Sequence, residues 1–208
     1  MTKFYAWIAV AVAAVVSVAM VVMTMTTRDG DKYAQCRSTK VAGEAAIGGP
    51  FNLIDENGKP VTEKDVIDEP TLVYFGYTFC PDVCPLDNQR NVEAIEILEK
   101  GGMSVKPVFI SIDPARDTPE VLRDFTDNLH DRMLGLTGTE EQVRAASKAY
   151  RTYFKKQEPE PGDEEFYLVD HSTLSYLMFP GEGMIELFRR DMGPDDMAKQ
   201  IGCFLDAR

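Results

Sequence analysis

The chain has 208 residues, of which 44% are hydrophobic and 27% are charged. This composition is typical of a folded protein with one hydrophobic core and excludes a disordered chain. The formal net charge of −12 at pH 7 argues against nucleic acid as a partner, because phosphates repel an acidic protein.

The N-terminal segment differs in composition from the rest of the chain. Phe4 to Thr27 contains no charged residue and is rich in Ala, Val and Met, which predicts a transmembrane anchor over residues 1–27. A cleaved signal peptide is the alternative, but the apolar run is longer than a signal core and no small-x-small cleavage site follows it. Residues 28–46 are mixed and polar, and we expect them to link the anchor to a domain at 47–208.

The charges that flank the predicted anchor do not settle its orientation. Lys3 is the only basic residue before it and four basic residues follow within the linker, so a simple count places the domain in the cytoplasm. Long domains cross the membrane largely regardless of charge, and paired cysteines favour an oxidising compartment. We therefore expect a single-pass anchor in a bacterial inner membrane, with the soluble domain in the periplasm.

Within the domain, apolar periodicity and turn residues predict alternating strands and helices, and hence an α/β layered fold. Asn57-Gly58 is typical of the tip of a β-hairpin that opens the domain. Thr118-Pro119 and the capping box Thr139 to Gln142 predict the starts of two helices. The predicted strands are 51–54, 71–76, 105–112, 134–137, 166–169, 173–179 and 184–189, and the predicted helices include 88–100, 139–154 and 194–206.

A strongly acidic run, Gln157 to Glu165, shows no apolar period. It is interpreted as a solvated loop, with a docking surface for a basic protein as the alternative.

Two cysteines four residues apart form the most informative feature of the chain. Cys80 and Cys84 follow a strand-like segment and open a helical pattern. At a helix start this spacing places both sulfurs on one face, with Cα atoms about 6 Å apart. That separation suits either a disulfide or two thiolates that bind one soft metal ion. The spacing alone leaves both possibilities open.

The chain contains only two histidines. His130 ends a helical pattern, where a surface or helix-capping role is the ordinary interpretation. His171 lies where one predicted strand gives way to the next, and a lone histidine at such a position is usually a hydrogen-bonded structural residue. Neither histidine by itself predicts a metal site.

Taken together, these motifs resemble the Sco/SenC copper proteins of cytochrome oxidase assembly. The resemblance runs from about residue 46 to the C-terminus and also includes an N-terminal anchor. It rests on Tyr74 to Thr78 leading into Cys80-Pro81-Asp82-Val83-Cys84-Pro85, on Ser111 to Pro119, on Val169-Asp170-His171, on Tyr176-Leu177 with Pro180, and on Gly48 to Phe51. The resemblance implies a thioredoxin-like fold with an N-terminal hairpin extension. It also implies one copper ion bound by Cys80, Cys84 and His171.

The chemistry of these residues agrees with the implied ligand set. Cu(I) is soft and accepts two thiolates and one imidazole, whereas a structural zinc ion requires a fourth ligand. A helix start also favours the thiolate over the thiol. Asp170 is a candidate partner of the histidine, although its side chain points to the opposite face if the strand continues there. No methionine-rich cluster is present, which favours one tightly held ion.

Cys36 and Cys203 lie outside the family motif. Cys203 falls off the apolar stripe of the last predicted helix, which predicts an exposed position. A disulfide between the two cysteines is one option, and neither is assigned to copper.

Three functions follow from the resemblance and the chemistry. The first is a copper metallochaperone for the CuA site in subunit II of cytochrome c oxidase, with copper held as Cu(I) or Cu(II) and received from a periplasmic donor. The second is a thiol–disulfide oxidoreductase that reduces the copper-binding cysteines of the target through Cys80 and Cys84. The third is a redox or copper sensor that uses the same cysteine pair.

Overall fold

The computed structural model describes residues 5, 7, 14–20, 32–37, 47–159, 161–162 and 166–208. They belong to two units, Met1–Gln35 and Cys36–Arg208. In the first unit, residues 14–20 are helical, and most of the predicted anchor lies outside the described residues. Among the residues described, no helix has the length and apolar character needed to cross a membrane.

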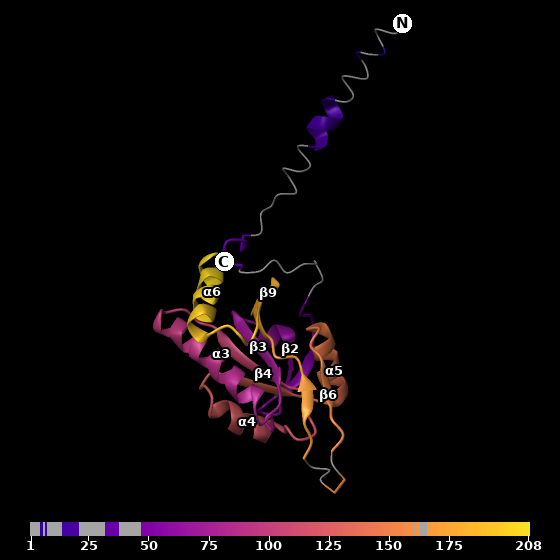
Figure 1. The fold of residues 1–208 in the computed structure, drawn as a ribbon, viewed down its shortest axis with the longest axis vertical. Helices are drawn as coiled ribbons and strands as arrows, with labels where there is room; N and C mark the ends of the chain where they lie inside the picture. Colours follow the sequence, from indigo (N-terminus) through magenta and orange to yellow (C-terminus); the bar gives the residue numbers. More distant parts are fainter. Residues whose placement is uncertain are drawn as a thin grey trace. The chain divides into compact units, whose positions relative to one another are not determined.

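The second unit is built on a mixed seven-stranded sheet with helices around it (Figure 1). The strand order is β2-β1-β5-β4-β3-β8-β9, and a separate two-stranded sheet joins β6 to β7. The strands are β1 (Asn52–Asp55), β2 (Pro60–Thr62), β3 (Thr71–Gly76), β4 (Lys106–Ser111), β5 (Leu134–Thr137), β6 (Phe154–Lys156), β7 (Val169–His171), β8 (Ser175–Phe179) and β9 (Gly183–Phe188). The helices are α2 (Glu63–Val66), α3 (Val83–Lys100), α4 (Pro119–Asp127), α5 (Glu140–Ala149) and α6 (Pro194–Asp206). The predicted α/β class is confirmed.

The centre of the sheet consists of parallel strands that are buried on both faces. β3 pairs in parallel with β4, and β4 with β5; every residue of β3 is buried. Such strands read as continuous apolar runs because helices cover both faces. The remaining pairs, including β3 with β8 and β1 with β5, are antiparallel.

The register of β3 and β4 fixes the place where the cysteine loop begins. Gly76 is opposite Ser111 at the ends of the two strands. A Cβ at Gly76 would lie 2.9 Å from the Phe109 ring and 3.0 Å from the sulfur of Cys84. Glycine therefore leaves the space into which the first turn of α3 packs.

Several helix and strand boundaries match the sequence. The hairpin turns at Asn57-Gly58, with Ile54 opposite Pro60. Thr118 caps α4 with proline in its first turn, and the capping box at Thr139 opens α5. The predicted final helix coincides with α6.

Three predicted boundaries are wrong. Helix α3 begins at Val83 rather than at residue 88. Helix α5 ends at Ala149 rather than near 154 because Arg151 adopts a left-handed conformation, with φ of 53°. Its backbone then follows the usual helix-ending pattern, in which the N–H of Thr152 donates to the carbonyl of Ser147 at 3.0 Å. The strand expected at 166–169 is instead β7, at Val169–His171, where it pairs with β6.

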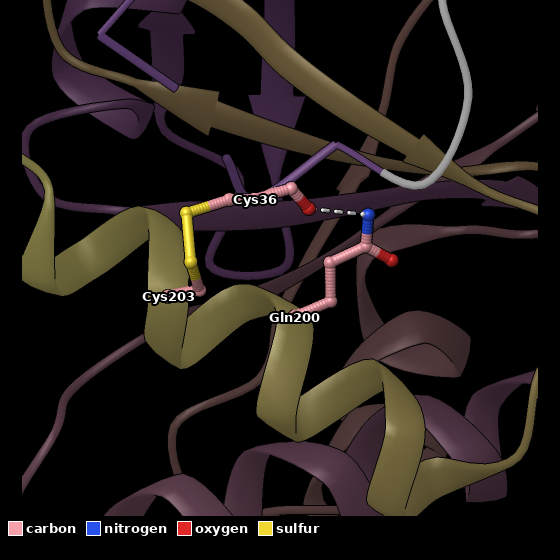
Figure 2. Close-up of a disulfide and its surroundings, with 3 residues drawn as sticks. All are labelled: Cys36, Gln200 and Cys203. Carbon is pink, nitrogen blue, oxygen red and sulfur yellow. Dashed lines mark hydrogen bonds between the residues drawn. A yellow bond between two sulfur atoms is a disulfide. The ribbon is translucent and has the colours of Figure 1, made fainter. Parts of the chain in front are cut away.

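A disulfide joins Cys36 to Cys203 on α6, with Cα atoms 5.6 Å apart (Figure 2). The side chain of Gln200 donates to the carbonyl of Cys36 at 3.0 Å. Next in the chain, the guanidinium of Arg37 donates to the carbonyl of Ile185 at 2.6 Å. The start of the second unit is thus held against α6 and against β9, a strand at the edge of the sheet.

We predict that replacing Cys36 and Cys203 by serine lowers the thermal stability of the domain. The disulfide spans 167 residues, and cross-links of this kind contribute about 2–4 kcal/mol by restricting the unfolded chain. The expected fall in melting temperature is roughly 5–15 °C, measured by circular dichroism. The melting temperature of each single variant should fall as much as that of the double variant, because either substitution removes the disulfide. A double variant that melts within 1 °C of the wild type would contradict the prediction.

Candidate metal and thiol site

Cys80 and Cys84 lie where β3 gives way to α3. Cys80 precedes the helix, in a turn where its N–H donates to the carbonyl of Tyr77 at 3.2 Å. Cys84 is in the first turn of α3, and its N–H donates to the sulfur of Cys80 at 3.4 Å. The expectation that the helix carries both cysteines is therefore wrong. Both side chains are reduced and buried, with exposed fractions of 6% and 0%.

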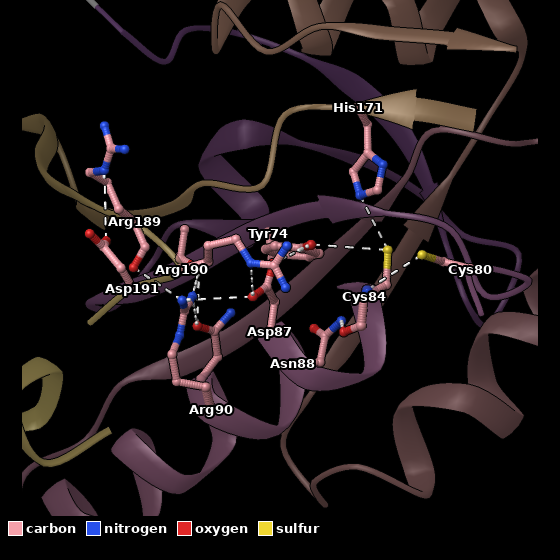
Figure 3. A network of polar contacts seen from close by, with 12 residues as sticks. Tyr74, Cys80, Cys84, Asp87, Asn88, Arg90, His171, Arg189, Arg190 and Asp191 are labelled. Atoms are coloured by element: carbon pink, nitrogen blue, oxygen red, sulfur yellow. Dashed lines mark hydrogen bonds and ion pairs between the residues drawn. The ribbon is translucent and has the colours of Figure 1, made fainter. Parts of the chain in front are cut away.

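His171 reaches this cysteine pair from the end of β7 (Figure 3). Its Nε2 lies 3.3 Å from the sulfur of Cys84, and its Nδ1 lies 3.1 Å from the carbonyl of Val169. A carbonyl can only accept, so Nδ1 donates to it, and Nε2 is the ring nitrogen that faces Cys84. Tyr77 packs edge-on against the imidazole with ring centres 5.7 Å apart. The structure thus brings together the three residues that the sequence singles out.

The ligand atoms of Cys84 and His171 lie closer together than a bound metal ion requires. Bonds of about 2.3 Å to sulfur and about 2.0 Å to nitrogen, in trigonal geometry, place the two ligand atoms about 3.7 Å apart. Cys84 and His171 are closer, at 3.3 Å, and make direct contact instead. Consistently, no three His, Cys, Asp or Glu side chains within the described ranges already form a metal site. The donor set suits a soft ion, but binding requires a separation of a few tenths of an ångström.

The two thiols differ sharply in acidity because one donates a hydrogen bond to the other. This bond, together with the backbone N–H groups of Asp82 and Cys84, lowers the pKa of Cys80 to about 5. The same bond, followed by burial, raises the pKa of Cys84 far above its ordinary value. At neutral pH the apo site therefore holds one thiolate and one thiol.

A polar network behind Cys84 connects it to the surface (Figure 3). The hydroxyl of Tyr74 donates to the carboxylate of Asp87 at 3.0 Å and lies 4.0 Å from the sulfur of Cys84. Asp87 in turn lies 3.8 Å from the guanidinium groups of Arg90 and Arg190. The sequence analysis missed this network. Its signal is the set of polar residues that interrupt the buried face of α3: Asp87, Asn88, Arg90 and Asn91.

Asp117 fixes the loop that carries Cys80. Its buried carboxylate accepts from the hydroxyls of Ser111 and Thr78, both at 2.6 Å, and from the N–H of Thr78 at 3.1 Å. Burial raises the pKa of Asp117, and these three donors satisfy its oxygens. The loop after β3 is thereby tied to the end of β4.

A second set of contacts holds the segment that leads into β7. The carboxylate of Asp113 binds the guanidinium of Arg116 at 2.6 Å and the hydroxyl of Tyr167 at 2.7 Å. Arg116 also lies over the ring of Tyr167 at 3.6 Å and over that of Phe79 at 4.8 Å. Phe79, exposed beside Cys80, is thus linked through Arg116 to the segment that positions His171.

Asp170 and His130 lie outside these networks. Asp170 is exposed and accepts from the amide of Gln157 at 2.7 Å, as expected for a side chain on the opposite face from His171. The imidazole of His130 lies 3.5 Å from Glu99 and accepts from the N–H of Arg132. These contacts agree with the structural role expected of His130.

The fold and the site together define a class of protein in which two buried cysteines and a distant histidine meet at the carboxyl end of a central parallel strand. The chain belongs to the SCO1/SenC family, whose model matches residues 39–206.

Individual relatives agree with this assignment. The chain is 50% identical to "Protein SenC" of Rhodobacter capsulatus over 202 residues, which cover 95% of this chain and 90% of that protein. It is 41% identical to "Protein SCO2, mitochondrial" of Saccharomyces cerevisiae, over 81% of this chain but only 57% of the yeast protein.

Solved structures show the same thioredoxin-like fold. The structure of Arabidopsis thaliana ScoI with copper bound is 41% identical, with a TM-score of 0.70 over 76% of this chain and 99% of that one. The structure of Bradyrhizobium japonicum ScoI with copper bound is 38% identical, with a TM-score of 0.67 over 76% of this chain and 98% of that one. The predicted thioredoxin-like architecture of the domain is confirmed.

We predict that Cys80 of the reduced apo protein titrates near pH 5. Thiolate absorbance at 240 nm should rise by one equivalent with a midpoint at about pH 5, because the pKa of Cys80 is lowered to that value. Since the folded pKa is depressed, this group stabilises the fold fully above its unfolded pKa of about 8.5. That contribution is lost as the pH falls toward 5.

Two variants serve as controls for this titration. Cys80→Ser should remove the step. Cys84→Ala should move it to higher pH, since it removes the side chain that donates the hydrogen bond to Cys80. A wild-type midpoint at the ordinary cysteine value would refute the assignment.

Proposed function

We propose that the protein is a copper metallochaperone that binds one copper ion through Cys80, Cys84 and His171 and helps to assemble the CuA site of cytochrome c oxidase. The observation that carries this proposal is the 3.3 Å contact between Nε2 of His171 and the sulfur of Cys84. The names of the relatives support it, since the Arabidopsis and Bradyrhizobium structures contain copper.

Copper is the cargo in this mechanism, and the protein residues bind and release it. The Cys80 thiolate is the first ligand because it is already ionised at neutral pH. Cys84 loses its proton as the ion enters, since the metal binds the thiolate. His171 binds through Nε2 because its Nδ1 is directed to the carbonyl of Val169. Ligands of the target then replace the three residues one at a time.

We further propose that residues 1–27 anchor the protein in a bacterial inner membrane, that 28–46 are a linker, and that the domain at 47–208 faces the periplasm. The Cys36–Cys203 disulfide supports this location, because disulfides persist in oxidising compartments. The partners in this scheme are the CuA domain of subunit II and a periplasmic copper donor.

The difference in acidity between the thiols also supports a second function, thiol–disulfide exchange. The Cys80 thiolate attacks a disulfide of the target, and one target thiolate leaves. Cys84 then loses its proton and attacks the sulfur of Cys80. The target gains two thiols, and the protein is left with a Cys80–Cys84 disulfide. Cys80 is the attacking residue because Cys84 is fully buried.

A His171→Ala variant separates the two functions. Loss of the imidazole ligand should weaken Cu(I) binding more than tenfold, measured by competition with a chromophoric chelator. Reduction of a model disulfide should persist, because Cys80 and Cys84 remain. His130→Ala is the matched control and should keep wild-type affinity. The three-ligand proposal fails if His171→Ala binds Cu(I) and Cu(II) as tightly as the wild type.

Oxidation provides an independent test. Formation of a Cys80–Cys84 disulfide removes both thiolates and should abolish copper binding, and selective reduction should restore one ion per chain. Peptide mapping by mass spectrometry distinguishes this disulfide from Cys36–Cys203, and metal analysis gives the copper content. Stoichiometric copper on protein shown to carry the Cys80–Cys84 disulfide would be incompatible with the proposed ligands.

A further inference from the structure

A basic surface lies along the strand that pairs with the histidine strand. Five basic residues and no acidic residue occur between Gln142 and Gln157, although the whole chain has a net charge of −12. All five are exposed, and they lie on α5, on β6 and in the segment between them. We call this set the basic edge: Arg144, Lys148, Arg151, Lys155 and Lys156.

Two shallow depressions lie along the basic edge. One depression, of about 490 Å³, is lined by Arg144, Lys148, Arg151 and the exposed ring of Tyr153. A second, of about 310 Å³, is lined by Arg144, Lys156 and Tyr167 and also by the acidic residues Asp113 and Glu140. Both depressions include Arg144, whose guanidinium pairs with the carboxylate of Glu140 at 2.5 Å and lies 4.8 Å from the centre of the Phe154 ring. The unpaired charge of the basic edge therefore comes mainly from its other four residues.

The structure describes no strand paired with the outer edge of β6. Among the described residues β6 pairs only with β7, and Figure 1 shows it beside α5. An extended segment of another protein can pair with such an edge and place its side chains in hollows on either side. Exposed lysines also keep strand edges from pairing at random, so the charges favour an acidic segment over a neutral one.

Arg151 retains its side chain in an unfavourable backbone conformation. Its φ of 53° is one that glycine adopts without strain and that other residues adopt at a cost. Glycine is the usual residue at this position after a helix. A strained residue that is not needed to form the turn points to a role for its guanidinium.

The register links the basic edge to the metal ligands. Phe154 of β6 is directly opposite His171 of β7, and Lys156 is opposite Val169. A segment seated on β6 is therefore one strand away from the proposed copper ligand. We propose that the basic edge is the docking surface for an acidic extended segment of the protein that exchanges copper with this site.

The identity of the partner in this proposal rests on the proposed function. The charge of the surface does not depend on it. An anionic membrane would also attract the basic residues. The run that follows β6, Glu158 to Glu165, is strongly acidic and would be repelled by such a membrane. This favours a protein segment of limited size over a charged plane.

The first experiment measures binding of a fluorescent twelve-residue peptide rich in Asp and Glu to the full-length apo protein at low salt. The edge variant is Lys148→Glu/Lys155→Glu/Arg151→Gly. The control variant Lys59→Glu/Lys100→Glu/Lys199→Ala changes the net charge equally at exposed lysines outside the basic edge. We expect the edge variant to lose at least tenfold in affinity and the control to match the wild type. A neutral Asn/Gln peptide should not bind.

Arg151→Gly alone distinguishes docking from folding. It should raise the melting temperature by about 2–4 °C and still weaken binding of the acidic peptide. A more stable variant that binds the peptide as well as the wild type would show that the guanidinium has no role in docking.

The second experiment tests whether the basic edge affects the rate of copper transfer. The copper-loaded full chain is mixed with the apo CuA domain of subunit II, and the transfer rate is followed at 50 mM and 500 mM salt. The edge variant should be about tenfold slower than the wild type at low salt and nearly equal at high salt, since salt screens the contacts. Its affinity for Cu(I) should be unchanged.

The outcomes separate the two proposals. If the wild type transfers copper and the edge variant does so equally fast at low salt, the docking surface is wrong while the chaperone function stands. If no copper is transferred but the acidic peptide binds the basic edge, the proposed partner is wrong and the surface stands. Equal peptide binding by edge and control variants, or binding of anionic phospholipid vesicles through the edge in place of the peptide, overturns the inference.

Discussion

The site depends on one buried carboxylate. Asp117 accepts three hydrogen bonds from Thr78 and Ser111, and so joins the loop after β3 to the end of β4. Burying a charge is costly unless its oxygens are satisfied, and here each donor belongs to an element that positions the site. With the loop fixed, Cys80 lies where the thiol and the N–H of Cys84 can both donate to its sulfur, and these bonds lower its pKa.

Much of this architecture could be predicted from the sequence because it depends on local signals. The buried strands β3 and β4, the Asn57-Gly58 hairpin and the caps at Thr118 and Thr139 each follow from neighbouring residues. Local sequence signals did not predict the features that depend on tertiary contacts. Arg151 ends α5 where the sequence pattern continued the helix, and no spacing rule places His171 against Cys84 across 87 residues. Only the resemblance to a known family supplied that third residue.

The polar residues on the buried face of α3 show why the remainder of the site was missed. Asp87 and Arg90 read as interruptions of an apolar stripe, yet they form the network that reaches Cys84 through Tyr74. A buried ion pair contributes little to stability by itself, whereas such groups are used to set the environment of a reactive side chain. The apolar periodicity of a sequence predicts which face of a helix is buried. It does not predict that a polar residue such as Asp87 will lie near the thiol of Cys84.

The Cys36–Cys203 disulfide also determines where the linker from the proposed anchor is attached to the domain. Cys36 is joined covalently to Cys203 on α6, and ten residues separate Cys36 from the domain at 47–208. In the proposed topology, a force that pulls on the anchor therefore acts on the domain at α6. It does not act on the β1–β2 hairpin. The ten residues taken out of the tether shorten its maximum reach by about 35 Å. In that proposed topology, reduction of this disulfide would lengthen the tether and enlarge the volume that the domain can reach.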